Sequence, residues 1–149
     1  MAILACSLFA SNHAVAEDAS AALSPDAVYD SFPTYSGTDL GLTVADGHAR
    51  FRLWSPKASA VRLYIYDNAN TSTPSETIEM QPADGGTWTA SLSPVPYGKF
   101  YTFSIQQDGK WLAETPGIWA KAVGVNGHRA AIIDFAATDP EGWKADKGP

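Results

Sequence analysis

The sequence contains a single cysteine, Cys6, among its 149 residues. One thiol cannot form a disulfide within the chain, and a zinc site built from several cysteines is excluded for the same reason. The three histidines, His13, His48 and His128, are far apart in the sequence. We therefore predict no metal site and no cofactor.

Basic residues are scarce: ten Lys and Arg stand against sixteen Asp and Glu, and the net charge is −6. Such a chain has no positive field to neutralise phosphates or an anionic membrane, so nucleic acid is not an expected partner. The length also excludes a catalytic (β/α)₈ barrel, which needs about 250 residues. No phosphate-binding loop and no nucleophile elbow is present. We therefore predict no catalytic residue and no enzymatic activity for this chain alone.

Long apolar runs are absent as well. Residues 2–10 (AILACSLFA) are too short to span a bilayer, and a polar stretch separates them from Ala14-Val15-Ala16. This order is typical of an export signal with an A-x-A cleavage site, although no basic residue precedes the run. We expect a signal-peptide-like leader at residues 1–16 and an exported protein, whether extracellular, cell-surface or periplasmic. The alternatives are a lipoprotein signal at Cys6, for which Leu4 is not the usual small residue, and a frayed terminus without a targeting role.

Short segments of alternating polarity fill the middle of the chain. Residues 49–54 (ARFRLW) place Phe51 and Leu53 on one face, which is the period of a half-buried strand. Residues 61–66 (VRLYIY) repeat the pattern, with Arg62, Tyr64 and Tyr66 on the outer face. Further strands are predicted at residues 76–80, 87–92, 100–106, 110–113 and 130–135.

Turn signals separate these segments roughly every ten residues. Asp84-Gly85-Gly86 and Asp108-Gly109 provide the positive φ that tight hairpins require. No stretch has the pattern of a long amphipathic helix. The sequence therefore predicts an all-β, immunoglobulin-like antiparallel β-sandwich, with a small closed barrel as the alternative.

Composition suggests where this sandwich begins and ends. Residues 17–33 are rich in Ala, Ser, Asp and Pro and indicate a flexible linker. Residues 138–149 are polar and contain two prolines, which is typical of a connector. We expect the sandwich to occupy residues 34–137.

The five tryptophans are the residues most open to a functional interpretation, because a large ring either fills a core or offers a platform to a flat ligand. Trp54 and Trp88 lie on strands and are expected to pack. Trp111 directly follows the Asp-Gly hairpin, where ligand contact and packing are equally expected. Trp119 and Trp143 lie in connections.

Several motifs occur in an order that resembles a known family. They are Tyr35-x-Gly37-x-Asp39-Leu40-Gly41, FRLWSPKA at 51–58, DGKW at 108–111, and AKAVGVNG at 120–127 followed by Arg129. Together they resemble the N-terminal domain of type I pullulanases, which belongs to carbohydrate-binding module family 48. The resemblance spans residues 35–149, and the AKAVGVNG run is its most specific part.

The resemblance implies an accessory module of a secreted or surface bacterial enzyme of glycoside hydrolase family 13. That enzyme would cleave α-1,6 linkages in pullulan, amylopectin or glycogen. The implied partners are an α-glucan and a downstream catalytic domain of the same parent chain, reached through residues 138–149. Trp119 and Trp143 are then predicted interdomain contacts. The alternative is a purely structural domain that packs on the catalytic barrel without binding glucan independently.

The resemblance also suggests a sugar site. Family members that bind glucan on their own combine two tryptophans with a lysine and an asparagine. Trp111 matches one tryptophan by its place after the hairpin, whereas Ser104 or a neighbour replaces the lysine and residues 130–131 are alanines. We predict glucan contact at Trp111, helped by Tyr64 and Tyr66, and weak binding because the site is incomplete.

Overall fold

The computed structural model describes residues 29–145 and 147. The predicted leader and residues 17–28 of the predicted linker lie outside the described residues. The chain divides into two units, Met1–Ser31 and Phe32–Pro149, and every described strand belongs to the second unit. Within the described part of the chain, no helix has the length and apolar character needed to cross a membrane.

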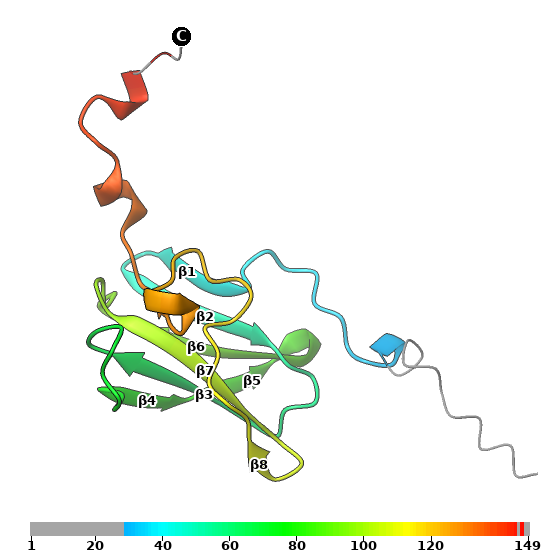
Figure 1. The fold of residues 1–149 in the computed structure, drawn as a ribbon. Helices are drawn as coiled ribbons and strands as arrows, with labels where there is room; N and C mark the ends of the chain where they lie inside the picture. The colour runs from blue at the N-terminus through cyan, green and yellow to red at the C-terminus, as the bar shows by residue number, and fades with distance from the viewer. Residues whose placement is uncertain (1–28, 146, 148–149) are drawn as a thin grey trace, which may run out of the picture. The chain divides into compact units, whose positions relative to one another are not determined.

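The described residues form nine strands in two antiparallel sheets that pack face to face (Figure 1). The first sheet has the order β1-β2-β6-β5, and the second has the order β4-β3-β7-β8 with β9 also paired to β7. The strands are β1 (Gly41–Ala45), β2 (His48–Trp54), β3 (Ala60–Tyr66), β4 (Glu76–Glu79), β5 (Gln81–Ala83), β6 (Thr87–Leu92), β7 (Phe100–Gln107), β8 (Lys110–Trp111) and β9 (Ala130–Ala131). Four 3₁₀ turns lie between or after them: η1 (Asp84–Gly86), η2 (Val125–Gly127), η3 (Phe135–Thr138) and η4 (Trp143–Ala145).

This architecture confirms the predicted all-β, immunoglobulin-like antiparallel sandwich. Five predicted strands correspond to β2, β3, β4, β6 and β7. The strands predicted at 110–113 and 130–135 are shorter than expected, because regular pairing ends at Trp111 in β8 and at Ala131 in β9. The sequence analysis did not predict β1 and β5, which form the two edges of the first sheet.

The Asp-Gly turns have the predicted geometry. Asp108 and Gly109 have φ values of 51° and 73° and join β7 to β8 as a two-residue loop. Asp46 and Gly47 have the same φ values and join β1 to β2. Positive φ at both loop positions matches the twist of the paired strands, which explains why this dipeptide favours tight hairpins.

The core lies between the inner faces of the two sheets. Phe51 from the first sheet packs edge-to-face on Tyr101 and Phe103 from the second, with ring centroids 5.1 and 6.5 Å apart. The other buried hydrophobic residues of this cluster are Ala49, Val61, Leu63, Ile65, Met80, Ala130 and Ile132. Burial of these apolar faces is the main force that holds the sheets together.

The segment before β1 is attached to the first sheet by a polar network. The Tyr35 hydroxyl donates to Oδ1 of Asp39, and Arg52 Nε donates to Oδ2 of the same carboxylate at 2.9 Å. Arg52 Nη1 also donates to the buried Thr87 hydroxyl on β6 at 2.9 Å. The spacing of Tyr35 and Asp39 in the family motif therefore has a structural role.

β8 continues past Trp111 as an irregular edge. Gln106 pairs with Trp111, but three residues earlier on β7 the partner of Phe103 is Thr115. One extra residue therefore lies on the outer strand, which is the arrangement of a β-bulge. The bulge ends the predicted 110–113 strand early and lets the Glu114 side chain reach the outer side of the second sheet, where it meets Thr102.

Candidate functional site

The outer face of the second sheet carries two of the residues predicted to contact glucan. We use the name outer face for the side chains that alternate with the buried core residues on these strands: Arg62, Tyr64, Thr77, Glu79, Thr102, Ser104, Gln106 and Trp111. Strand pairing places Arg62 between Glu79 and Ser104, and Tyr64 between Thr77 and Thr102. The face therefore combines two aromatic rings with charged groups and the exposed Thr77 hydroxyl, whereas Thr102 and Ser104 are themselves buried.

Trp111 is half-buried, and its indole has a defined neighbour. The Arg62 guanidinium lies 4.0 Å from the ring centroid, which is a close cation–π contact. Glu79 holds the guanidinium in place, because its Oε1 accepts a hydrogen bond from Arg62 Nε at 2.6 Å. The indole thus packs against an arginine while part of the side chain stays exposed.

Tyr64 belongs to the same cluster. The hydrogen bond from Arg62 to Glu79 and, after it, the Tyr64 side chain raise the pKa of the Arg62 guanidinium, against the effect of burial. Tyr64 is half-buried on the central strand β3. Arg62 therefore links the two aromatic residues that the sequence analysis selected separately.

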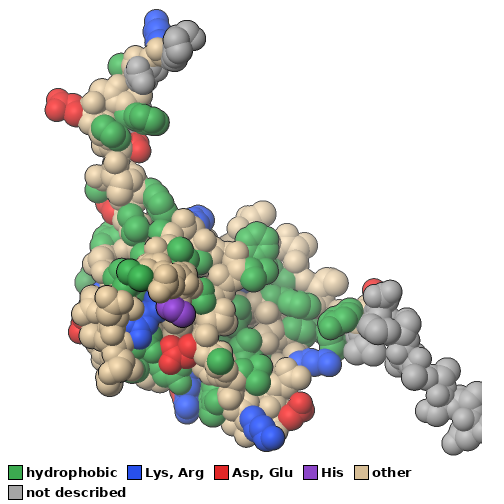
Figure 2. Space-filling view, viewed as in Figure 1, with side chains coloured by type: hydrophobic (Ala, Val, Ile, Leu, Met, Phe, Trp, Pro, Cys, Tyr) green, Lys and Arg blue, Asp and Glu red, His purple; other side chains and the backbone are tan. Residues whose placement is uncertain are grey.

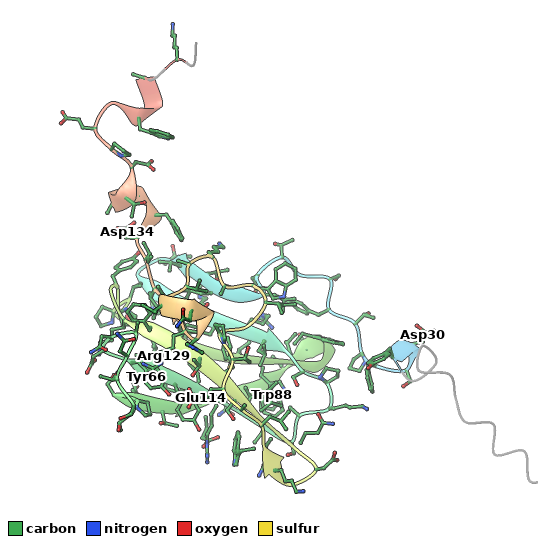
Figure 3. The ribbon with its side chains drawn as sticks, viewed as in Figure 1. Asp30, Tyr66, Trp88, Glu114, Arg129 and Asp134 are labelled. Atoms are coloured by element: carbon green, nitrogen blue, oxygen red, sulfur yellow. The ribbon has the colours of Figure 1, made fainter. Side chains whose placement is uncertain are left out.

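Tyr66 lies on the same side of β3 as Arg62 and Tyr64, as predicted, but other side chains cover it, so the prediction that its ring is accessible to a ligand is wrong. Its side chain is only 1% exposed, because the Arg129 guanidinium covers the ring at 3.5 Å from the centroid. Its hydroxyl donates to Oε2 of Glu114 at 2.6 Å. Burial, with this hydrogen bond as the second cause, raises the pKa of Tyr66 to about 12. Figure 3 shows Tyr66, Glu114 and Arg129 grouped together.

Arg129 is a structural residue that the sequence analysis did not select. Its Nη1 donates to the Asn68 carbonyl at 3.0 Å, and its Nη2 donates to the Thr71 carbonyl. The guanidinium therefore joins the loop after β3 to the segment before β9 while it covers Tyr66. The position of Arg129 two residues after the end of the AKAVGVNG run was the available signal, and its role explains part of that motif.

The two tryptophans expected to pack both do so. Trp88 packs against the core, and its Nε1 donates to the Ser55 carbonyl at 3.1 Å. Trp54 is 41% exposed, and its Nε1 donates to the Pro33 carbonyl at 3.1 Å. Trp54 therefore packs at an edge, and the packed part of the chain includes Pro33, which was assigned to the linker.

Trp119 and Trp143 are both exposed, at 53% and 61%. Close backbone packing holds Trp119: a Cβ on Gly41, whose φ is 87°, would lie 2.7 Å from the Trp119 Cβ. Its neighbour Ile118 is 92% exposed. The space-filling view shows several such hydrophobic patches on the surface (Figure 2). An interdomain role for Trp119 and Trp143 remains a prediction.

The arrangement of the outer face suits binding of a polyhydroxylated ligand. The C–H face of a sugar ring can lie against an indole or phenol ring, while Arg62, Glu79 and the exposed Thr77 hydroxyl exchange hydrogen bonds with the sugar hydroxyls. Among residues 29–145 and 147, no group of three or more His, Cys, Asp or Glu side chains is arranged to hold a metal ion. The fold and this face together define a small β-sandwich with an aromatic, polar surface, typical of a carbohydrate-binding module.

Comparisons with known proteins identify the family. Residues 39–133, more than half of the chain, match the family model described as Carbohydrate-binding module 48 (Isoamylase N-terminal domain). The chain belongs to this family, and the predicted resemblance is confirmed.

Solved structures of pullulanases are similar to this chain. The apo pullulanase of Paenibacillus barengoltzii is 39% identical, with a TM-score of 0.74, over 83% of this chain and 19% of that protein. The pullulanase of Bacillus acidopullulyticus is 32% identical, with a TM-score of 0.73, over 82% of this chain and 15% of that protein. That of Anoxybacillus sp. LM18-11 is 29% identical, with a TM-score of 0.64, over 76% and 16%. The chain thus spans less than one fifth of the length of these pullulanases.

Proposed function

We propose that this chain is the α-glucan-binding accessory module of an α-1,6-glucan debranching enzyme, and that a glucan chain contacts its outer face. The observation that carries this proposal is the Arg62–Trp111 cluster. The guanidinium, 4.0 Å from the ring centroid and bonded to Glu79 at 2.6 Å, holds the indole in a fixed orientation on the outer face. A ring fixed in advance loses little conformational entropy when a ligand packs on it.

The comparisons support the choice of ligand and of parent enzyme. One structure of the Paenibacillus barengoltzii pullulanase is a complex with maltohexaose and α-cyclodextrin, and another is a complex with maltotetraose. By analogy, we propose that this module positions pullulan, amylopectin or glycogen for a downstream catalytic domain. In this proposal the chain itself supplies binding and no catalytic residue.

The organisation of the parent protein is part of the same proposal. Residues 1–16 direct export to the periplasm, the cell surface or the medium, and residues 17–33 link this leader to the sandwich at 34–137. Residues 138–149 connect the sandwich to the catalytic domain. Trp119 and Trp143, which are both exposed, contact that domain.

The area that one ring offers indicates that binding is weak. Trp111 is half-buried, so a sugar covers at most about 100 Å² of it and contributes at most roughly 2.5 kcal/mol at about 25 cal/mol per Å². A millimolar complex already needs about 4.1 kcal/mol. Tyr64 and the polar groups of the outer face must therefore add to the contact with Trp111.

Native gels that contain amylopectin test this function. We expect the wild-type chain to be retarded slightly and Trp111→Ala to be retarded clearly less, because the substitution removes up to about 2.5 kcal/mol of contact at the outer face. Trp119→Ala is the matched control, since it removes another exposed indole outside the outer face, and it should migrate like the wild type. Trp111→Phe keeps a ring for packing and shows whether any loss arises from misfolding. Equal retardation of Trp111→Ala and wild type would refute the proposed site, and no retardation of the wild type would favour the purely structural role.

A further inference from the structure

A second concave surface lies away from the outer face, at the side of the sandwich where β1 borders the segment after β9. It is a groove of about 300 Å³. β1 contributes Leu42 and Val44, which pair with Phe51 and Ala49 and so point toward the inside of the sandwich. Residues 131 and 133–136 form the other wall. The groove shares no residue with the outer face.

A tyrosine hydroxyl without a partner reaches into this groove. Tyr101 lines the groove and is only 1% exposed. Its hydroxyl forms no hydrogen bond with any described residue. Every fully buried side-chain oxygen of the described residues has a hydrogen-bond partner, so the Tyr101 hydroxyl is not fully buried. The hydroxyl is therefore the part of Tyr101 that stays accessible, from inside the groove. Burial of the phenol raises its pKa to about 12, so the hydroxyl is protonated and can both donate and accept a hydrogen bond.

Two opposite charges flank the groove without neutralising each other. Lys121 forms no ion pair with a described residue. Oδ1 of Asp134 accepts a hydrogen bond from the Ala136 N–H at 3.1 Å, which leaves its Oδ2 free of described partners. Figure 3 shows Asp134 where the chain leaves the sandwich. The groove thus offers one cationic donor and one anionic acceptor, with no net charge from the pair.

Half-exposed rings supply the apolar surface of the groove. Phe135 is 49% exposed and Tyr97 is 47% exposed. Val44 at 41% exposure adds an aliphatic surface. The groove therefore combines ring faces with a small number of polar groups, which is the usual composition of a small-molecule site.

We propose that this groove is a second carbohydrate site, which takes one or two hexopyranose units of an α-glucan. A sugar is neutral and carries hydroxyls that can donate to Asp134, accept from Lys121 and exchange hydrogen bonds with Tyr101, while its C–H faces lie on Phe135 and Tyr97. An anion would meet Asp134, a cation would meet Lys121, and a purely apolar ligand would leave the polar groups desolvated and unpaired. The volume fits a short oligosaccharide, since small-molecule sites begin at roughly 300 Å³.

The site goes beyond the proposed function because it uses different residues on another side of the sandwich. A module with two separated sugar contacts can bind two parts of one branched polysaccharide at once. The second contact is then intramolecular, which raises the apparent affinity without any new interaction at the first site.

Calorimetric titration with maltotriose tests the groove. The titrated chain carries Trp111→Ala, which removes the main proposed sugar contact of the outer face. In Trp111→Ala we expect binding to remain measurable. The further substitution Tyr101→Phe removes only the hydroxyl and keeps the ring that packs on Phe51, so the Kd should rise by roughly three- to tenfold, as for the loss of one hydrogen bond. Tyr66→Phe is the matched control, because it removes a buried tyrosine hydroxyl that belongs neither to the groove nor to the accessible outer face, and it should leave the Kd of the Trp111→Ala chain unchanged.

The outcomes separate this inference from the proposed function. Loss of all binding in Trp111→Ala, with wild-type binding intact, overturns the groove and supports the outer face. An equal Kd for the Tyr101→Phe and Tyr66→Phe variants of the Trp111→Ala chain also overturns the groove. Binding can also be unchanged by Trp111→Ala and weakened by Tyr101→Phe and by Phe135→Ala. This result supports the groove and contradicts the outer-face function.

Discussion

At the scale of single residues, contact with an arginine does not decide whether an aromatic ring stays accessible. Trp111 and Tyr66 both lie against a guanidinium, at 4.0 and 3.5 Å from the ring centroids. Arg62 leaves Trp111 half-buried, whereas Arg129 and Glu114 bury Tyr66 completely. Alternation in the sequence predicts that both rings point outward, but it contains no information on which ring a distant segment covers.

Tyr66→Phe tests the structural role of the covered ring. The substitution removes the hydrogen bond to Glu114, so we expect the free energy of unfolding to fall by about 1 kcal/mol with no change in glucan binding. Urea denaturation measures this difference. Tyr97→Phe is the control, because the Tyr97 side chain is half-exposed rather than buried, and it should change stability little. A loss of glucan binding in Tyr66→Phe at normal stability would contradict the structural assignment.

The Tyr35–Asp39–Arg52 network predicts a dependence of stability on pH. The hydrogen bond from Tyr35, and after it the contact with Arg52, hold the pKa of Asp39 below its ordinary value of 3.8, against the effect of burial. A carboxyl group whose pKa is lower in the folded chain than in the unfolded chain stabilises the folded state. This stabilisation is fully present when the pH is above the pKa of the unfolded chain, and it is lost as the pH falls through the pKa of the folded chain.

We therefore expect the stability difference between wild type and Asp39→Asn to be largest above about pH 5, and to shrink as the pH falls through and below 3.8. Urea denaturation at a series of pH values measures it. Asp46→Asn removes an exposed carboxylate and serves as the control. A difference that stays constant down to low pH would contradict the predicted shift.

At the scale of elements, the sequence predicts the central strands better than the edges. β2, β3 and β7 alternate clearly because one side of each packs on the core. β1 was missed although Asp46-Gly47 marks its hairpin, and β5 is a three-residue edge strand that contains Pro82. β8 ends early because of a bulge, and a bulge depends on the partner strand as well as on local sequence. The outer face could be predicted from alternation, but the cluster of Arg62 with Trp111 requires the register of β3, β7 and β8.

The hairpin that presents Trp111 depends on backbone conformation. Gly109 has a φ of 73°, and a Cβ added at this position would meet no atom within 4 Å. Gly109→Ala therefore causes no clash and costs only the conformational penalty of roughly 1–2 kcal/mol. We expect lower stability in urea and weaker retardation in amylopectin gels, because β8 frays. Asp108→Asn is the control, since asparagine adopts positive φ readily. Unchanged stability in Gly109→Ala would show that the turn tolerates another geometry.

At the scale of the whole molecule, the chain is a module of the carbohydrate-binding module 48 family with surfaces on more than one side. The outer face carries Trp111, and the loop at Ile118 and Trp119 exposes two large apolar side chains elsewhere. The sequence pattern and motif order predicted the fold, the family and Trp111 as a candidate. They did not predict the groove beside β1, because its residues come together only through the packing of segments that are far apart in the sequence.

Chemical-shift mapping by NMR, with maltoheptaose added to the ¹⁵N-labelled chain, tests the central claim most directly. We expect saturable shifts of the Trp111 indole N–H and of amides in β3, β4 and β8, centred on Arg62 and Tyr64. Amides of the covered Tyr66 cluster should shift less. Saturable shifts that spare the Trp111 indole and these strands, or no shifts at millimolar sugar, would contradict the claim that a glucan binds the outer face.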